Sequence, residues 1–404
     1  MIFKLALRNI LRNKRRTTLA SLAIGIGVCA IILTDGFVEG MKYNLIESVV
    51  STFMGDAQIH RSGFRVSREV ESVIKNSQQV INILADDSEI KAYAPRTISF
   101  AMISSPDNYV NVMMLGVDPK KEQIITRIME AIQKGGPPQT ENEILVGSRL
   151  ASKLEVTIGD KVVVTVAQAN SSELSQEQFR ISGIYSYGSK ELDGAMVYVQ
   201  IAKSQQMLNL GNNIHEIALK FMQLKRAGNL DISFWDEYSV DGNEALSWRK
   251  LAPEIQYMIE MIYISITLIS AIIGMLVGLI IMNTLFMSLY ERLFELGVLR
   301  AIGTRPQQIV AMIIAESAVL SVASVIVGTL LAILFGTLLA VYGIDYGAME
   351  IGETTLHKPI KFIFNLRQFT LYPVATIIFS MLVAIYPGVY ASKMTLARAT
   401  DKTL

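Results

Sequence analysis

Few side chains in this sequence could carry out catalysis or bind a metal ion. Its 404 residues include three histidines, His60, His215 and His357, and a single cysteine, Cys29. The histidines lack the spacing of metal ligands, and one cysteine excludes both an internal disulfide bond and a CxxC zinc site. The sequence contains no motif of a phosphate loop, a dinucleotide fold, a zinc protease or a serine hydrolase. We therefore predict no catalytic residue, no metal site and no cofactor in this chain.

Charged and apolar side chains alternate in one short segment, residues 289–308. Leucines recur every three to four residues, which is the spacing of a helix with one apolar face. Gly303 followed by Pro306 should stop this helix. An amphipathic helix of this kind suits docking of a soluble partner, and the alternative is a simple interfacial helix. The residues that we assign to docking are Glu291, Arg292, Leu293, Glu295, Leu296, Leu299 and Arg300.

The elements around this segment are apolar blocks. Apolar residues make up 51% of the chain and charged residues 18%, with a mean hydropathy of +0.38. The 37 Lys and Arg residues against 36 Asp and Glu exclude an overall basic nucleic-acid binder. A helix needs about 20 apolar residues to cross a bilayer. Four blocks predict four spans, near residues 19–33, 258–287, 309–342 and 369–386.

Basic residues near the ends of these blocks predict the orientation of the spans. Lysines and arginines precede the first block, separate the second from the third and follow the fourth, so these segments should face the cytoplasm. The loop after the third block is also basic and disagrees, but the N-terminal charges outnumber it. The first block lacks a cleavage pattern and reads as an uncleaved anchor. Both termini are then cytoplasmic, and residues 43–256 are extracytoplasmic.

Residues 43–256 are long enough for a core of their own and show mixed α and β patterns. Helical spacing covers residues 69–85, and two strands at 97–105 and 109–117 are joined by a Ser-Pro-Asp-Asn turn. We expect two small lobes, with the Gly-Gly-Pro-Pro loop at 135–138 as a boundary. Further strands are expected at 161–166, 179–187 and 196–199, and a helix at 201–210.

Three stretches resemble the MacB/FtsX/LolC-LolE type of ABC transporter permease. ALRNILRNKRRTTLA at 6–20 resembles the family's basic N-terminal segment, and ERLFELGVLRAIGTRPQQI at 291–309 resembles its coupling helix. YPGVYASKMTLARA at 386–399 resembles the end of its last span. The resemblance covers nearly the whole chain. It implies a membrane protein of four transmembrane α-helices with a large α+β extracytoplasmic (periplasmic) domain between helices 1 and 2.

Within this family the sequence is most similar to the lipoprotein-releasing LolC/LolE branch. The similar stretches are GDAQIHRSGF at 55–64, FRISGIYSYGSKELDGAMVYV at 179–199 and LSWRKLAPEIQYMI at 246–259. The resemblance implies a permease that is not itself an enzyme and that docks on a LolD-like cytoplasmic ATPase dimer, which would bind ATP and Mg. It also implies a second permease copy or a sister permease, membrane lipids, lipoprotein cargo and a periplasmic carrier, in a bacterial inner membrane.

The resemblance also indicates where a carrier would bind. The corresponding segment, residues 167–178, is polar and contains no proline or arginine, which departs from the family. The candidates in this loop are Ser171, Ser172, Glu173 and Leu174.

An acyl chain that leaves the bilayer needs an apolar path, because about 0.8 kcal/mol per CH₂ is lost on exposure to water. We place this path between the first two spans; the alternative is that its side chains face lipid or pack a dimer. The candidates are Ile32, Leu33, Phe37, Tyr257, Met261, Ile264 and Leu268. Gly274 and Gly278 are four residues apart, which predicts close helix packing within the chain or between two permeases.

Two other functions stay open. The chain could be a mechanotransmitting permease for another cargo, such as a peptide, an antibiotic or a regulator of cell-wall hydrolases. It could also be a membrane-anchored sensor without transport, although a sensor needs no docking helix. The expected segments are a cytoplasmic amphipathic basic helix (1–16), span 1 (17–42), the two-lobed domain (43–256), span 2 with its stalk (257–288), the coupling helix (289–308), span 3 (309–342), a short periplasmic loop (343–368), span 4 (369–390) and a cytoplasmic tail (391–404).

Overall fold

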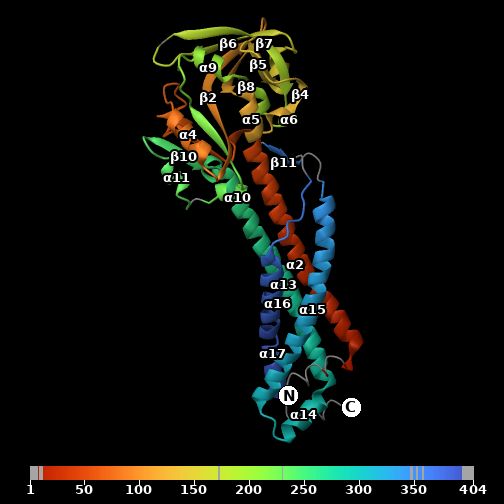
Figure 1. Cartoon of the computed structure of the whole chain (residues 1–404). Coiled ribbons are helices and arrows are strands. Elements are labelled where there is room, and N and C mark those ends of the chain that lie inside the picture. Colours follow the sequence, from red (N-terminus) through yellow and green to blue (C-terminus); the bar gives the residue numbers. More distant parts are fainter. Residues whose placement is uncertain are drawn as a thin grey trace. The chain divides into compact units, whose positions relative to one another are not determined.

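The computed structural model describes residues 8, 12–171, 173–229, 231–345, 349–351, 354–356 and 359–393. The chain forms two compact units. One, here called the helical unit, comprises Met1–Tyr43, Met258–Tyr346 and Lys358–Leu404. The other, the sheet unit, comprises Asn44–Tyr257 and Gly347–His357. Figure 1 shows the elements coloured along the sequence, and many of them are labelled. Most of the predicted segments 1–16 and 391–404, and His357, lie outside the described residues.

Within the residues that the structure describes, four helices are long and apolar enough to cross a membrane, in agreement with the predicted number of spans. A short helix lies between the second and the third span and ends before Gly303, which has a positive φ of +99°. The third span begins at Pro306, so Gly303 and Pro306 separate the two helices, as the sequence predicts. The first span is α2 (Lys14–Val49), continued by the π-helix η1 (Val50–Met54), and the second is α13 (Pro253–Glu291). The third is α15 (Pro306–Tyr342), and the fourth consists of α16 (Leu366–Val383) and α17 (Ile385–Ser392). The short helix between the second and the third span is α14 (Leu293–Ala301).

Backbone contact at glycines holds the helical unit together. A Cβ atom added to Gly328 of α15 would lie 2.5 Å from the carbonyl oxygen of Gly25 in α2. One added to Gly40 would lie 1.9 Å from the carbonyl oxygen of Lys361. Small residues allow such close approach between helices in lipid. Any larger residue at these two positions should therefore force the elements apart.

The sheet unit is built on one sheet of ten strands. Six of these strands close a barrel, because each pairs with two others of the six and the last returns to the first. Their order around the barrel is β2, β3, β8, β5, β7 and β6, and β6 pairs with β2. The strands are β1 (Ala57–Arg61), β2 (Ile90–Ser104), β3 (Tyr109–Val117), β4 (Ile132–Gly135), β5 (Glu143–Gly147), β6 (Lys161–Ala167), β7 (Leu174–Tyr185), β8 (Met196–Gln200), β9 (Glu216–Phe221) and β10 (Asn243–Ser247); β11 (Met349–Ile351) pairs with β12 (Thr354–Leu356).

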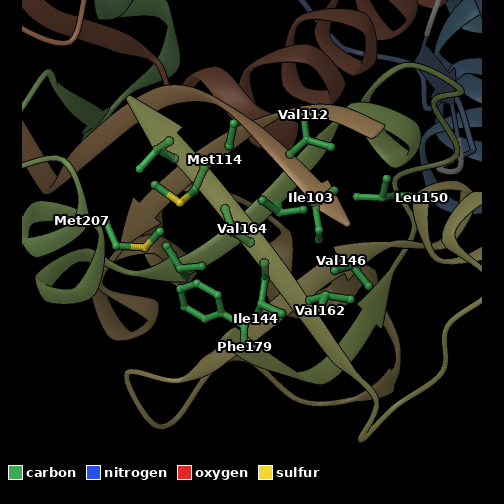
Figure 2. Close-up of a cluster of buried hydrophobic side chains, with 14 of the residues drawn as sticks. Ile103, Val112, Met114, Ile144, Val146, Leu150, Val162, Val164, Phe179 and Met207 are labelled. Atoms are coloured by element: carbon green, nitrogen blue, oxygen red, sulfur yellow. The ribbon is translucent and has the colours of Figure 1, made fainter. Parts of the chain in front are cut away.

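The barrel interior is an apolar core. Ile103, Val112, Val164 and Phe179, which come from four different strands, are all buried in it. Figure 2 shows these side chains pointing toward one another.

The helices of the sheet unit are short. They are α3 (Phe64–Ser67), α4 (Ser77–Asp86), α5 (Pro119–Ile125), α6 (Ile128–Ala131), α7 (Ser148–Leu154), α8 (Leu192–Ala195), α9 (Ile201–Met207), α10 (Leu224–Ala227), α11 (Phe234–Glu237) and α12 (Trp248–Leu251).

Strand β2 belongs to two parts of this sheet. Its second half pairs with β6 in the barrel, whereas its first half pairs with β9, which continues to β1 and β10. The loop at 135–138 connects β4 to β5, and both pair with β7, so the prediction that this loop divides two lobes was wrong. The predicted helix at 69–85 is helical only from Ser77, because Asn76 adopts a left-handed conformation at φ +53°.

A buried ion network joins three elements of the sheet unit. Arg96 of β2 is fully buried, and its Nη2 atom lies 2.6 Å from Glu122 Oε1 of α5. Its Nη1 atom lies 2.7 Å from Glu216 Oε1 of β9. Buried charges are tolerated only when they are paired and hydrogen-bonded. The network therefore fixes α5 against the sheet.

Replacing Arg96 with leucine should destabilise the sheet unit by about 3–5 kcal/mol, because two carboxylates would stay buried without their cation. Amide hydrogen exchange of β2, β9 and α5 in the full chain measures this loss. The matched control is Arg226→Gln, which breaks the exposed Arg226–Glu89 pair and should change exchange little. Equal protection in the two variants would show that the buried network does not stabilise the fold.

Candidate coupling site

Helix α14 is the short helix that connects α13 to α15, and an ion pair anchors it. Arg292, at its N-cap, places Nη1 2.7 Å from Glu316 Oε1 of α15. The side chains of Arg292 and Glu316 are only 13% and 7% exposed. Arg292 Nε also lies 3.1 Å from Glu295 Oε2. Because ion pairs gain strength away from water, this contact holds the start of α14 against α15.

Two arginines near the start of α2 contact the junction of α13 and α14, where Glu291 ends α13 and Glu295 lies in α14. Arg12 Nη1 lies 2.6 Å from Glu295 Oε1, and Arg16 Nη1 lies 2.6 Å from Glu291 Oε2. The hydrogen bond from Arg12 lowers the pKa of Glu295 despite the opposing effect of burial, and Arg292 lowers it further. Glu295 therefore stays ionised at neutral pH, and its pairing is lost only in acid, as the pH falls through this lowered pKa. We call Arg12, Arg16, Arg292 and their three glutamates the clamp.

The apolar side chains of α14 divide between two faces. Leu296 is 4% exposed and packs with Leu289, Met312 and other residues of the bundle. It therefore anchors α14 and does not present surface for docking, contrary to our assignment. Phe294 and Ile302 are 61% and 78% exposed. The sequence reasoning missed Phe294, although Phe294, Val298 and Ile302 recur every four residues as a second apolar line.

The other docking candidates lie around these two faces. Leu293 is partly buried against the bundle, and Leu299 is 37% exposed. Glu291 and Glu295 are exposed but paired in the clamp, and Arg300 is half-buried in the last turn of α14. The surface that remains for a partner is formed by Phe294, Leu299 and Ile302.

The structure does not gather the cargo-path candidates into one cavity. Ile32 is fully buried in an apolar cluster that includes Val325 and Ala332 of α15. Leu33 is partly buried against this cluster. That position closes Ile32 to a ligand unless the bundle opens. Phe37 is half-buried. Met261, Ile264 and Leu268 are exposed along α13, and Tyr257, which belongs to the sheet unit, is also exposed.

The remaining candidates lie at two further places. Gly274 faces open space, whereas Gly278 packs against Phe379 of α16 in the same chain. Ser171, Glu173 and Leu174 lie at the β6–β7 turn, where Leu174 is exposed; Ser172 lies outside the described residues.

Two family models match this chain. The FtsX-like permease C-terminal model matches residues 267–396, which include α14 and the clamp residues Arg292 and Glu316. The MacB-like periplasmic core domain model matches residues 17–226, more than half of the chain. This chain is an ABC transporter permease of the MacB/FtsX/LolC-LolE type. The resemblance stated from its sequence is thereby confirmed, and so is its architecture of four transmembrane helices and an α+β periplasmic domain.

Relatives of this permease carry names from two branches of the family. The lipoprotein-releasing system transmembrane protein LolE of Haemophilus influenzae is 22% identical over 95% of both chains. LolC of Xylella fastidiosa (strain Temecula1) is 22% identical over 79% of this chain and 77% of its own. The macrolide export ATP-binding/permease protein MacB of Bdellovibrio bacteriovorus is 25% identical over 79% of this chain and 51% of its own.

The clamp makes a prediction of its own. Replacing Glu316 with glutamine leaves the largely buried Arg292 side chain without its main carboxylate. Amide exchange in α14 should therefore speed up by a factor equivalent to about 3 kcal/mol. Hydrogen exchange of the full chain in detergent measures it. The control is Glu291→Gln, whose partner pair is more exposed and should matter less. If both variants exchange like the parent, the clamp does not position α14.

Proposed function

We propose that this permease couples ATP hydrolysis by a LolD-like cytoplasmic ATPase dimer to the extraction of lipoproteins from the bacterial inner membrane toward a periplasmic carrier. The observation that carries the proposal is α14, a helix held rigidly between two spans with an exposed apolar face. The LolE relative, which aligns along 95% of both chains, supports the choice of cargo. In this proposal both termini and α14 face the cytoplasm, and the sheet unit faces the periplasm.

Phe294 and Ile302 would enter an apolar groove of the ATPase. Burying one such side chain contributes about 1.5–3 kcal/mol. The clamp and the buried Leu296 prevent α14 from turning alone, so a movement of the ATPase would pass to α13 and α15. A second permease copy or a sister chain would complete the transporter. The carrier would contact the β6–β7 turn at Ser171–Leu174, and the acyl chains would pass along the exposed α13 face at Met261, Ile264 and Leu268.

A permease for another cargo is the second candidate. The MacB relative, which is named for macrolide export, is 25% identical over 79% of this chain. The polar segment 167–178, which departs from the LolC-type loop, also favours a cargo that needs no lipoprotein carrier. The coupling role of α14 is the same in both candidates.

Docking can be tested by placing a charge on the exposed face of α14. Phe294→Asp should release the ATPase from the purified permease, because an aspartate cannot enter an apolar groove without a desolvation cost of several kcal/mol. Co-purification in mild detergent, with the ATPase quantified against the permease, gives the readout. Val66→Asp is the control, since Val66 is 93% exposed in the sheet unit. Undiminished ATPase recovery and transport with Phe294→Asp would remove α14 from the docking site.

The cargo can be tested by photo-crosslinkers at Phe37 and Met261. The lipoprotein proposal expects crosslinks to a lipidated protein that disappear when its acylation is blocked. A crosslinker at the exposed Ile326 of α15 serves as the control and should label bulk lipid only. Labelling of lipid alone at all three positions, with carrier loading intact, would place the path elsewhere, and crosslinks to a non-acylated molecule would favour the second candidate.

A further inference from the structure

An apolar groove of about 650 Å³ lies between α13 and α16, with α2 contributing Ile31 to its wall. That volume is typical of sites for small ligands, which occupy about 300–1,000 Å³. Its lining includes Ala271 and Gly274 of α13 and Ala375 and Phe379 of α16. All of these residues belong to the helical unit. The groove is separate from Met261, Ile264 and Leu268, where we place the cargo.

Charged and hydroxyl groups lie at one end of this groove. Tyr372, which lines the groove, donates its hydroxyl to Asp35 Oδ1 of α2 at 2.9 Å. Asp35 follows Ile31 by one helical turn. One and two turns further along α2, Glu39 accepts a hydrogen bond from Tyr263 at 3.0 Å, and Lys42 donates to the Tyr263 hydroxyl at 2.7 Å. An apolar groove with one ionic end matches the shape of an amphiphile.

The charges at this end select the head group. Tyr372 is neutral, so its hydroxyl does not cancel the charge of Asp35, and no salt bridge to Asp35 is found in the part of the chain that the structure describes. Lys42 pairs with Glu39 at 2.5 Å and lies about 10 Å along α2 from Asp35. A head group with an ammonium for Asp35 fits this arrangement.

A helix of a second copy fits the groove less well. The small residues Ser270, Gly274 and Gly278 follow one another at four-residue spacing, which in lipid favours helix contact. However, a Cβ added to Gly278 would lie 2.9 Å from the Phe379 ring. The chain's own α16 therefore covers one of the positions that a second helix would need.

We propose that this groove binds one acyl chain of a phospholipid with a primary ammonium head group, phosphatidylethanolamine, with the ammonium at Asp35. The proposal goes beyond the proposed function and does not depend on the cargo. A primary ammonium donates hydrogen bonds to a carboxylate, and such charge-assisted bonds are the strong ones. A trimethylated head group has no such donor, and an anionic head group is repelled by Asp35.

Native mass spectrometry of the full chain, purified in detergent with its co-purifying subunits, tests the proposal. Phosphatidylethanolamine, phosphatidylcholine and phosphatidylglycerol with identical acyl chains are added without cargo or ATP. Phosphatidylethanolamine should bind best. Asp35→Asn should weaken its binding about tenfold and strengthen phosphatidylglycerol binding, because the repulsion of the anionic head group is removed. Gly274→Leu, which fills the groove, should reduce binding of all three lipids.

Two matched controls complete the experiment. Glu254→Gln removes an exposed carboxylate at the start of α13, and Leu276→Phe adds bulk on α13 outside the groove; both should bind lipid like the parent. Equal binding of the three lipids, unaffected by Asp35→Asn, overturns the proposal. The proposal is also overturned if Gly274→Leu releases a second permease copy while lipid binding persists. Displacement of the lipid by added lipoprotein would overturn it as well. The measurement involves no transport, so its failure leaves the proposed function untouched.

Discussion

The ion pair between Arg292 and Glu316 determines where α14 can lie. Both side chains are largely shielded from water, and the cost of separating two such charges is high. The pair joins the N-cap of α14 to α15, while Leu296 buries the adjoining face of the helix. A helix fixed in this way can present Phe294 and Ile302 outward and still move only together with the spans on either side. The coupling role that we propose depends on this constraint.

The sheet unit uses the same device for a different purpose. Arg96 is fully buried between Glu122 and Glu216, and so joins a helix and two strands. Neither arrangement is needed for an apolar core, because the barrel interior already supplies one. Buried pairs instead fix which elements meet, since the wrong neighbour would leave a charge without a partner. A permease that transmits movement needs such fixed joints.

Much of the architecture was predictable because it depends on short-range patterns. Runs of about 20 apolar residues predict spans wherever they occur, and Gly303 with Pro306 predicts the end of α14. The partners of the charges were not predictable. Arg12 and Glu295 are 283 residues apart in the sequence, and no local pattern reports such a pairing. For the same reason the spacing of the leucines could not show that Leu296 faces inward. Closure of the barrel, where β6 returns to β2, depends on equally distant pairing.

The most direct test of this account is a pair of photo-crosslinkers on α14 in the complex purified from native membranes. A crosslinker at Ile302, which is 78% exposed, should link the permease to an ATP-binding subunit. One at Leu296, which is 4% exposed, should give only links within the permease. That difference would show that α14 docks through the face that the clamp leaves outward. Links to an ATPase from Leu296 and none from Ile302 would contradict it.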